Sequence, residues 1–351
     1  MKITFLTPHS IRAWGGGEKW IYGITNLLHE KNIKTKVIAL KYSPEGIYRI
    51  SEEQLENIVK FEYEEIEYEG RSRFTPLHAK SLSEVIDADA LYVTGGYYFF
   101  LKQSLKLQTA KVYGFHDPAL QTPKNYFQKR IIKKLLPRFD VIHLLNSPQL
   151  NILKLPEKSV LLENTWFEKV PPRVPKLVKF SLVFFGRHEK DKGVETVKYI
   201  IDNLPPDIDL FICGTGSMSN ELKKEKENVK YMGFVTEDVL GRVISECHGV
   251  LFPSYSEASS LVALESLAHN TPLVYRDIIQ NEFLSNRPLC KKASSDIEFL
   301  ENIKTLKTYY YEKPEEYLLQ CDELFSTLMP KNEYADLFLN KIINVAINNF
   351  R

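Results

Sequence analysis

Apolar residues follow two alternating spacings along the chain. Short runs rich in β-branched and aromatic residues occupy positions 2–8, 35–40, 90–96, 110–117 and 140–146. Between the first two runs, apolar residues recur three and four positions apart from Trp20 to Leu28, which places them on one face of a helix. Short apolar strands that alternate with helices predict a parallel β-sheet covered by helices.

The same alternation begins again after a proline-rich segment. Residues 170–176 hold three prolines in seven positions, which is typical of a stiff connector between domains. Strand-like runs then recur at 179–187, 207–216, 229–234, 249–254 and 272–275, and an apolar helical pattern closes the chain. We therefore expect an α/β protein with two Rossmann-like domains, residues 1–169 and 170–331, that face a central ligand-binding cleft.

Composition restricts the classes of partner. The chain has 351 residues, 46 basic and 45 acidic side chains and a net charge of +1, so it has no overall attraction to nucleic acid or to a membrane. The four cysteines lack a metal-binding spacing and are expected to be buried thiols; they are Cys213, Cys247, Cys290 and Cys321. There is no signal-peptide pattern and no run of about 18 apolar residues, so we expect a cytoplasmic protein.

Two glycine-rich loops follow predicted strands. Gly15, Gly16 and Gly17 open the first helix, where bare amides could approach an anion, although they could equally form a flexible loop. Gly214 and Gly216 resemble part of a dinucleotide fingerprint. The acidic residue that a nicotinamide site needs about twenty residues later is missing, which argues against an NAD-dependent oxidoreductase.

Charged residues flank two further strand ends. Arg187 and Lys192 lie in a glycine-bounded loop where two cations could hold a diphosphate, and the alternative is a solvated turn. Glu257 and Glu265 lie eight positions apart around a predicted helix start. Ser259 or Ser260 could cap that helix, so its first amides would lie between two carboxylates that suit sugar hydroxyls. The alternative for Glu265 is an acid on an exposed helix face.

In this order and spacing, the motifs at 15–18, 115–118, 186–193, 213–216, 229–235 and 253–274 resemble the retaining family 4 glycosyltransferases of the GT-B fold. Glu257 and Glu265 match the family's Glu-x7-Glu signature. The resemblance covers nearly the whole chain. It implies two Rossmann-like domains, the first on the acceptor side and the second on the nucleotide-sugar side, with a last helix at about 332–351 that packs back on the first.

The resemblance also implies a role for each motif residue. His116 would lie near the anomeric carbon, Glu257 would face the hydroxyls of the transferred sugar, and Glu265 would bind the ribose. Arg187 and Lys192 would hold the diphosphate. The remaining donor contacts would come from Gly15, Gly16, Gly17, Gly214, Phe234, Val235, Ser259, Ser260 and Leu261. Departures from the family pattern are Ala258, Ser259 and Ser260 in place of a Gly-Phe-Gly type run, Asn164 in place of an Asn-Gly pair, and Asn270 in place of glycine.

The expected reaction is transfer of a hexosyl group, with retention, from a nucleoside-diphosphate sugar to an acceptor hydroxyl. The acceptor would be a glycan or a lipid-linked molecule, and neither a metal nor a resident cofactor is expected. The alternatives are a sugar-nucleotide epimerase of the same fold and a non-catalytic sugar-nucleotide-binding protein. Residues 124–139 combine basic and apolar side chains without an acid, so they could contact an anionic membrane or form an ordinary basic helix face. Nucleic acid is not an expected partner.

Overall fold

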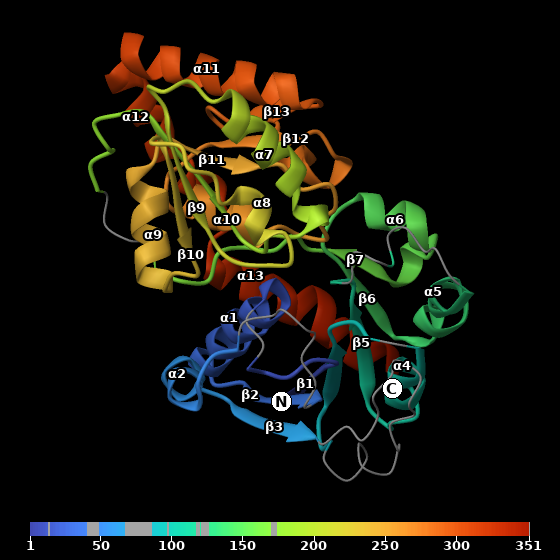
Figure 1. Cartoon of the computed structure of the whole chain (residues 1–351). Helices are drawn as coiled ribbons and strands as arrows, with labels where there is room; N and C mark the ends of the chain where they lie inside the picture. Colours follow the sequence, from blue (N-terminus) through green and yellow to red (C-terminus); the bar gives the residue numbers. More distant parts are fainter. Residues whose placement is uncertain are drawn as a thin grey trace. The chain divides into compact units, whose positions relative to one another are not determined.

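A computed structural model describes residues 1–12, 15–40, 49–66, 86–96, 98–116, 120, 126–169 and 174–350. The chain divides into two compact units. Unit 1 consists of Met1–Phe167 and Pro330–Arg351, and unit 2 consists of Glu168–Met329. Each unit contains one parallel sheet with helices, as Figure 1 shows. The prediction of an α/β protein with two parallel sheets is confirmed.

The sheet of unit 1 has seven strands in the order β3-β2-β1-β4-β5-β6-β7. All its neighbouring strands are parallel. The order reverses between β1 and β4, which is the switch point where doubly wound sheets bind ligands at the carboxyl ends of their strands. The strands are β1 Lys2–Thr7, β2 Lys34–Leu40, β3 Glu62–Ile66, β4 Ala90–Val93, β5 Ala110–Gly114, β6 Val141–Leu144 and β7 Ser159–Leu161.

The end of the chain supplies helices to unit 1. Helix α13 packs on α1 and α14 packs on β5, and both are drawn in red beside the blue and teal elements of Figure 1. The α-helices of unit 1 are α1 Gly16–Glu30, α2 Glu52–Ile58, α4 Tyr98–Ser104, α5 Tyr126–Arg130, α6 Pro148–Leu153, α13 Lys331–Leu337 and α14 Asn344–Phe350. π-Helical turns cover Ile131–Leu135 and Phe338–Ile343, and 3₁₀ turns cover Leu136–Arg138 and Pro156–Lys158.

The sheet of unit 2 has six parallel strands in the order β10-β9-β8-β11-β12-β13. Its order reverses between β8 and β11. The strands are β8 Ser181–Phe185, β9 Asp209–Cys213, β10 Val229–Gly233, β11 Gly249–Phe252, β12 Leu273–Arg276 and β13 Lys291–Ala293. The α-helices are α7 Val194–Asn203, α8 Ser219–Leu222, α9 Glu237–Glu246, α10 Leu261–Ala268, α11 Asp296–Glu312 and α12 Pro314–Glu323, and 3₁₀ turns cover Lys190–Lys192, Ile279–Leu284 and Phe325–Thr327.

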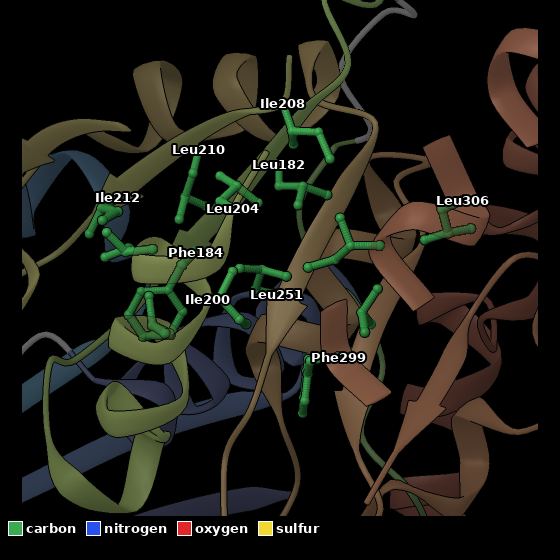
Figure 2. Packing of buried hydrophobic residues seen from close by; sticks show 14 of the residues in the cluster. Leu182, Phe184, Ile200, Leu204, Ile208, Leu210, Ile212, Leu251, Phe299 and Leu306 are labelled. Atoms are coloured by element: carbon green, nitrogen blue, oxygen red, sulfur yellow. The ribbon is translucent and has the colours of Figure 1, made fainter. Parts of the chain in front are cut away.

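The apolar strand runs are buried on both faces of the unit 2 sheet. Leu182 and Phe184 belong to the cluster on one face, and Val183 and Phe185 belong to the cluster on the other. Alternate residues of a strand point to opposite faces, so a strand covered by helices on both sides must be apolar throughout. Figure 2 shows the first cluster, in which side chains of β8, β9 and β11 pack together with those of α7 and α11.

Two segments form only short α-helices. In the charged run at 220–227, α8 ends at Leu222, and Lys226 Nζ donates to the carbonyls of Ile201 and Leu204 at 2.8 Å each. The described part of the 124–139 segment, which begins at 126, changes between α, π and 3₁₀ geometry instead of forming one α-helix. Residues 124 and 125 lie outside the described residues.

Candidate functional site

The candidate residues of unit 2 lie at its switch point. Arg187 and Lys192 follow β8, and Glu257 and Ser260 follow β11, the strand next to β8 in the sheet. Because neighbouring parallel strands end at the same edge of a sheet, the two loops leave β8 and β11 side by side. The topology therefore joins candidate groups that lie about seventy residues apart in the sequence.

Close backbone contacts hold these two loops together. The amide of Tyr255 donates to the carbonyl of Asp191 at 2.8 Å. Gly193 has a φ of +76°, and a Cβ atom there would lie 2.3 Å from the carbonyl oxygen of Pro253. Only glycine combines this left-handed backbone with so close an approach. Gly193 thus serves loop packing, which the sequence motif alone did not indicate.

Two of the cations in the loop after β8 are candidate residues. Lys192 Nζ is 2.8 Å from Glu257 Oε1, and their side chains are 21% and 11% exposed. The Arg187 guanidinium lies 3.8 Å from Asp191, and both of these side chains are about half exposed. The structure therefore places Lys192 directly beside Glu257 in a partly buried pair, with Arg187 in the same loop as a more open cation.

Helix α10 begins next to this pair. Ser260 is its N-cap, and the Ser260 hydroxyl accepts from the amide of Ala263 at 3.2 Å, which confirms one of the two predicted caps. The amides of Leu261 and Val262 take no part in that cap. They lie at the positive end of the helix dipole, which favours an anion.

Glu265 lies within α10 and is not on an exposed face. It is 5% exposed and lies one turn beyond Val262 on the same side of the helix. The Val262 side chain is 3.8 Å from the position of a Cβ on Gly186, at the end of β8. The alternative of a solvated acid at 265 is therefore wrong, because this carboxylate belongs to a buried helix face that turns towards the end of β8.

The loops after β9 and β10 complete the same edge of the sheet. Gly214 has a φ of +117°, and a Cβ there would lie 1.9 Å from the carbonyl oxygen of Gly186. The Gly214 amide donates to the carbonyl of Gly233 at 2.6 Å. Phe234, the residue after Gly233, is 41% exposed, whereas Val235 is partly buried against the core. Gly214 thus joins three strand ends, and Phe234 is an exposed aromatic residue beside them.

A buried arginine supports the Glu257 loop and was missed in the sequence analysis. The Arg276 guanidinium lies 3.1 Å from Asp296 Oδ1 and 3.3 Å from the Tyr255 hydroxyl, and it also donates to Thr196. Its Cζ atom is 4.6 Å from the centre of the Tyr255 ring. Arg276 thus links β12, α7 and α11 to the loop that carries Glu257. The signal was a charged residue directly after the apolar run at the end of β12.

The glycine loop of unit 1 carries its own carboxylate. Glu18 is 8% exposed in the first turn of α1, and its Oε1 lies 3.6 Å from His9 Nδ1. A Cβ on Gly15 would lie 2.8 Å from the other Glu18 oxygen, whereas a Cβ on Gly17 would meet no atom within 4 Å. Gly15 is therefore close to Glu18, and Gly17 has open space around it. Gly16 is the first residue of α1.

His116, two residues after the end of β5, is the other candidate in unit 1. Its Nε2 lies 3.0 Å from the Tyr92 hydroxyl, and its ring centre is 4.4 Å from that of Trp20. Burial, and to a smaller extent the nearby His143, holds the pKa of His116 well below its usual value. His116 is therefore neutral at pH 7 and can accept a hydrogen bond. His116 and the Gly15 loop belong to unit 1, and the other candidates form one cluster in unit 2.

The basic segment presents two different faces. Ile131, Ile132, Leu135 and Leu136 are at most 8% exposed and belong to the core of unit 1. They are therefore not available for insertion into a membrane. Tyr126 is 64% exposed, Phe127 is 37% exposed, and the lysines at 129, 133 and 134 are exposed. Among the helices of the described residues, none is both long and apolar enough to cross a bilayer.

Comparisons with known proteins agree with this architecture. Residues 179–308 match the family model of glycosyl transferases group 1. A processive diacylglycerol alpha-glucosyltransferase of Acholeplasma laidlawii is 24% identical over 200 residues, which are 55% of this chain. The match spans 58% of the length of that relative.

Solved structures resemble the chain over nearly its whole length. HepE of Anabaena, in complex with UDP and glucose, has a TM-score of 0.78 at 16% identity, with 98% of this chain and 100% of that chain covered. WaaG, a glycosyltransferase involved in lipopolysaccharide biosynthesis, has a TM-score of 0.69 at 14% identity, with 97% and 99% covered. The chain therefore has the two-sheet fold of these proteins.

Proposed function

We propose that this chain, a member of the group 1 glycosyltransferases with the GT-B fold, transfers a hexosyl group from a UDP-sugar to an acceptor hydroxyl with retention at the anomeric carbon. The choice of a uridine nucleotide is supported by HepE, which binds UDP and glucose. The observation that carries the proposal is the cluster at the unit 2 switch point. There, Lys192 and Glu257 adjoin the start of α10.

The charges of this cluster match the parts of a nucleotide sugar. Lys192, Arg187 and the first amides of α10 would bind the diphosphate, and Lys192 can do so while it keeps Glu257, because an ammonium has three donors. Glu257 would accept from hydroxyls of the transferred sugar, and Glu265 from the ribose. Phe234 and Val235 would contact the base, and the backbone of Ser259, Ser260 and Leu261 would contact the sugar and phosphates.

The proposed rate acceleration comes from stabilisation of the leaving group. Negative charge grows on the diphosphate as the glycosidic bond breaks, and the two cations and the helix dipole are fixed before this happens. We propose that these groups stabilise the leaving group without a metal or a resident cofactor. His116 and the loop of Gly15, Gly16 and Gly17 would contribute to the same reaction from unit 1.

A glycan or lipid-linked acceptor is proposed, with peripheral contact to an anionic membrane. The exposed lysines of 129–134, with Tyr126 and Phe127, would make this contact by charge and by aromatic side chains.

Co-sedimentation with phosphatidylglycerol vesicles tests the membrane contact. Lys133→Glu/Lys134→Glu should lower the bound fraction several-fold, whereas Lys223→Glu/Lys224→Glu, an exposed lysine pair of unit 2, should not. Equal binding by both variants would contradict the contact.

The function itself is tested first with the whole chain and nucleotides. We expect UDP or a UDP-sugar to raise the midpoint of thermal unfolding, while GDP and ADP leave it unchanged, because a ligand that binds only the native state stabilises it. UDP release that requires an added glycan or lipid acceptor would then support a transferase. Conversion of the donor without any acceptor would favour the epimerase alternative, and binding without any product would favour a binding protein.

A further inference from the structure

A chain of hydrogen bonds crosses the unit 1 sheet beneath His116. Tyr92, on β4, has its hydroxyl 3.0 Å from His116 Nε2 and 2.7 Å from Nδ1 of His143, on β6. His143 Nε2 lies 2.8 Å from the carbonyl oxygen of Leu162, just after β7. Tyr92 and His143 are both fully buried. These hydrogen bonds thus lead from the partly buried His116 to a backbone carbonyl through two side chains that water does not reach.

Gly114 makes this crossing possible. It lies on β5, the strand between β4 and β6, and a Cβ there would lie 2.2 Å from the Tyr92 hydroxyl and 2.7 Å from His116 Cδ2. Any other residue would occupy the space through which the tyrosine reaches across β5. The fold therefore keeps a gap at this position for the contact between Tyr92 and both histidines.

The donor and acceptor in each of these hydrogen bonds follow from the last acceptor, the carbonyl oxygen of Leu162. A carbonyl oxygen only accepts, so His143 must carry its proton on Nε2. Burial lowers the pKa of His143 to about 4, so the ring is neutral at pH 7 and its Nδ1 is an acceptor. Tyr92 must then donate to His143 Nδ1, and burial keeps the Tyr92 pKa well above its usual value, so this proton is retained. The Tyr92 oxygen in turn accepts from His116 Nε2.

We propose that Tyr92 and His143 hold His116 in the Nε2–H tautomer and leave Nδ1 as its unprotonated nitrogen. Tyr92 and His143 are positioning residues in this scheme, and Gly114 admits them. His116 would use Nδ1 to accept a hydrogen bond from a substrate hydroxyl. This use rests on the proposed transferase function, but the tautomer itself does not depend on it.

The test is ¹⁵N NMR of the whole chain labelled at histidine, at pH 7, because protonated and unprotonated ring nitrogens have widely separated shifts. His116→Gln and His143→Gln, which each remove one ring, assign the signals. We expect both rings in the wild-type protein to be neutral with the proton on Nε2. A His116 ring with its proton on Nδ1, or a cationic ring, would overturn the proposal without any need for a variant of Tyr92.

Tyr92→Phe then tests the role of the hydroxyl. It keeps the ring packing and removes the link, so His116 should change from one tautomer to a mixture, and His143 should keep its Nε2 proton. Tyr113→Phe is the matched control, because Tyr113 is a buried tyrosine of β5 whose ring packs on Phe139. An unchanged His116 spectrum in Tyr92→Phe would show that Tyr92 does not set the tautomer.

Turnover separates this inference from the proposed function. If both hold, Tyr92→Phe should lower kcat in proportion to the fraction of His116 that moves to the Nδ1–H tautomer, about twofold for an even mixture, with little change in the KM for the donor. If the His116 tautomer depends on Tyr92 but the protein has no transferase activity, the positioning role of Tyr92 is supported and the proposed function is refuted. If Tyr92→Phe keeps full activity although His116 no longer holds a single tautomer, the positioning role of Tyr92 is supported, and His116 Nδ1 takes no part in the reaction.

Discussion

Two lysines of one loop show how residue-scale chemistry depends on surroundings. Lys190 and Lys192 both lie in the 3₁₀ turn after β8. Lys190 is 78% exposed and pairs with Glu195 at 3.4 Å, whereas Lys192 is 21% exposed and pairs with Glu257. A cation held in a partly buried site interacts more strongly with a phosphate than one surrounded by water. Of these two lysines, we therefore expect Lys192 and not Lys190 to stabilise a leaving diphosphate.

The corresponding prediction concerns turnover. Lys192→Ala should lower kcat about a hundredfold, because it removes a preorganised charge from the leaving group. Lys190→Ala is the control and should keep activity near that of the wild-type protein. Steady-state release of UDP with an acceptor present measures both variants. Similar rates for the two would place the diphosphate elsewhere.

Residue identities were predictable where the signal is local. Ser260 was one of two expected caps because capping depends on residues within three positions of the helix start. The role of Arg276 was not predictable, since its partners Thr196, Tyr255 and Asp296 come from three other segments. The roles assigned to Glu257, Glu265 and His116 stay predictions until substrates are tested.

At the scale of elements, the loops after β8, β9, β10 and β11 act as one assembly. Gly214 touches the backbone at Gly186 and bonds to Gly233, while Gly193 touches Pro253. The glycines at 193 and 214 are thus needed for close backbone packing with positive φ, in addition to any contact with a ligand. This packing positions the residues of the candidate site before a donor binds.

We therefore expect Gly214→Ala to destabilise the protein. A methyl group 1.9 Å from the Gly186 carbonyl, at a φ of +117°, should reduce the free energy of unfolding by about 2 kcal/mol or more. The midpoint of thermal unfolding, followed by circular dichroism, should fall by several degrees. Gly17→Ala is the control, since a Cβ there has no neighbour within 4 Å. An equal midpoint in both variants would contradict this packing.

At the scale of the whole molecule, several histidines are buried as neutral rings. Burial lowers the pKa of His143 to about 4 and that of His248 to about 3. An unfolded chain titrates its histidines near pH 6.5. Below that pH the unfolded state binds protons that the folded state does not, so stability falls as the pH falls and is unaffected above it.

This linkage predicts a window of acid sensitivity. The folded protein should be equally stable at pH 8 and pH 7 and lose stability from pH 6.5 downwards, with ~3 kcal/mol lost at pH 4 through His143 alone. Urea unfolding at successive pH values measures the loss. Constant stability between pH 6.5 and pH 5 would mean that the buried histidines are protonated in the folded state.

The alternation of strands and helices in both units was predictable from the amino-acid pattern. Apolar spacing encodes which faces an element buries, so local patterns suffice to predict that part of the fold. The sequence also indicated which strand ends carry glycine residues and charged residues. Family resemblance added roles for those residues, because the motifs appear in a fixed order.

Which of these groups come into contact depends on the order of the strands in each sheet. Lys192 and Glu257 become a 2.8 Å pair because β8 and β11 are neighbours in the sheet. Tyr92 reaches His116 and His143 because β5 carries Gly114 at the crossing point. Strand order and register set these contacts, and no local spacing encodes them, because each depends on how distant segments pack together.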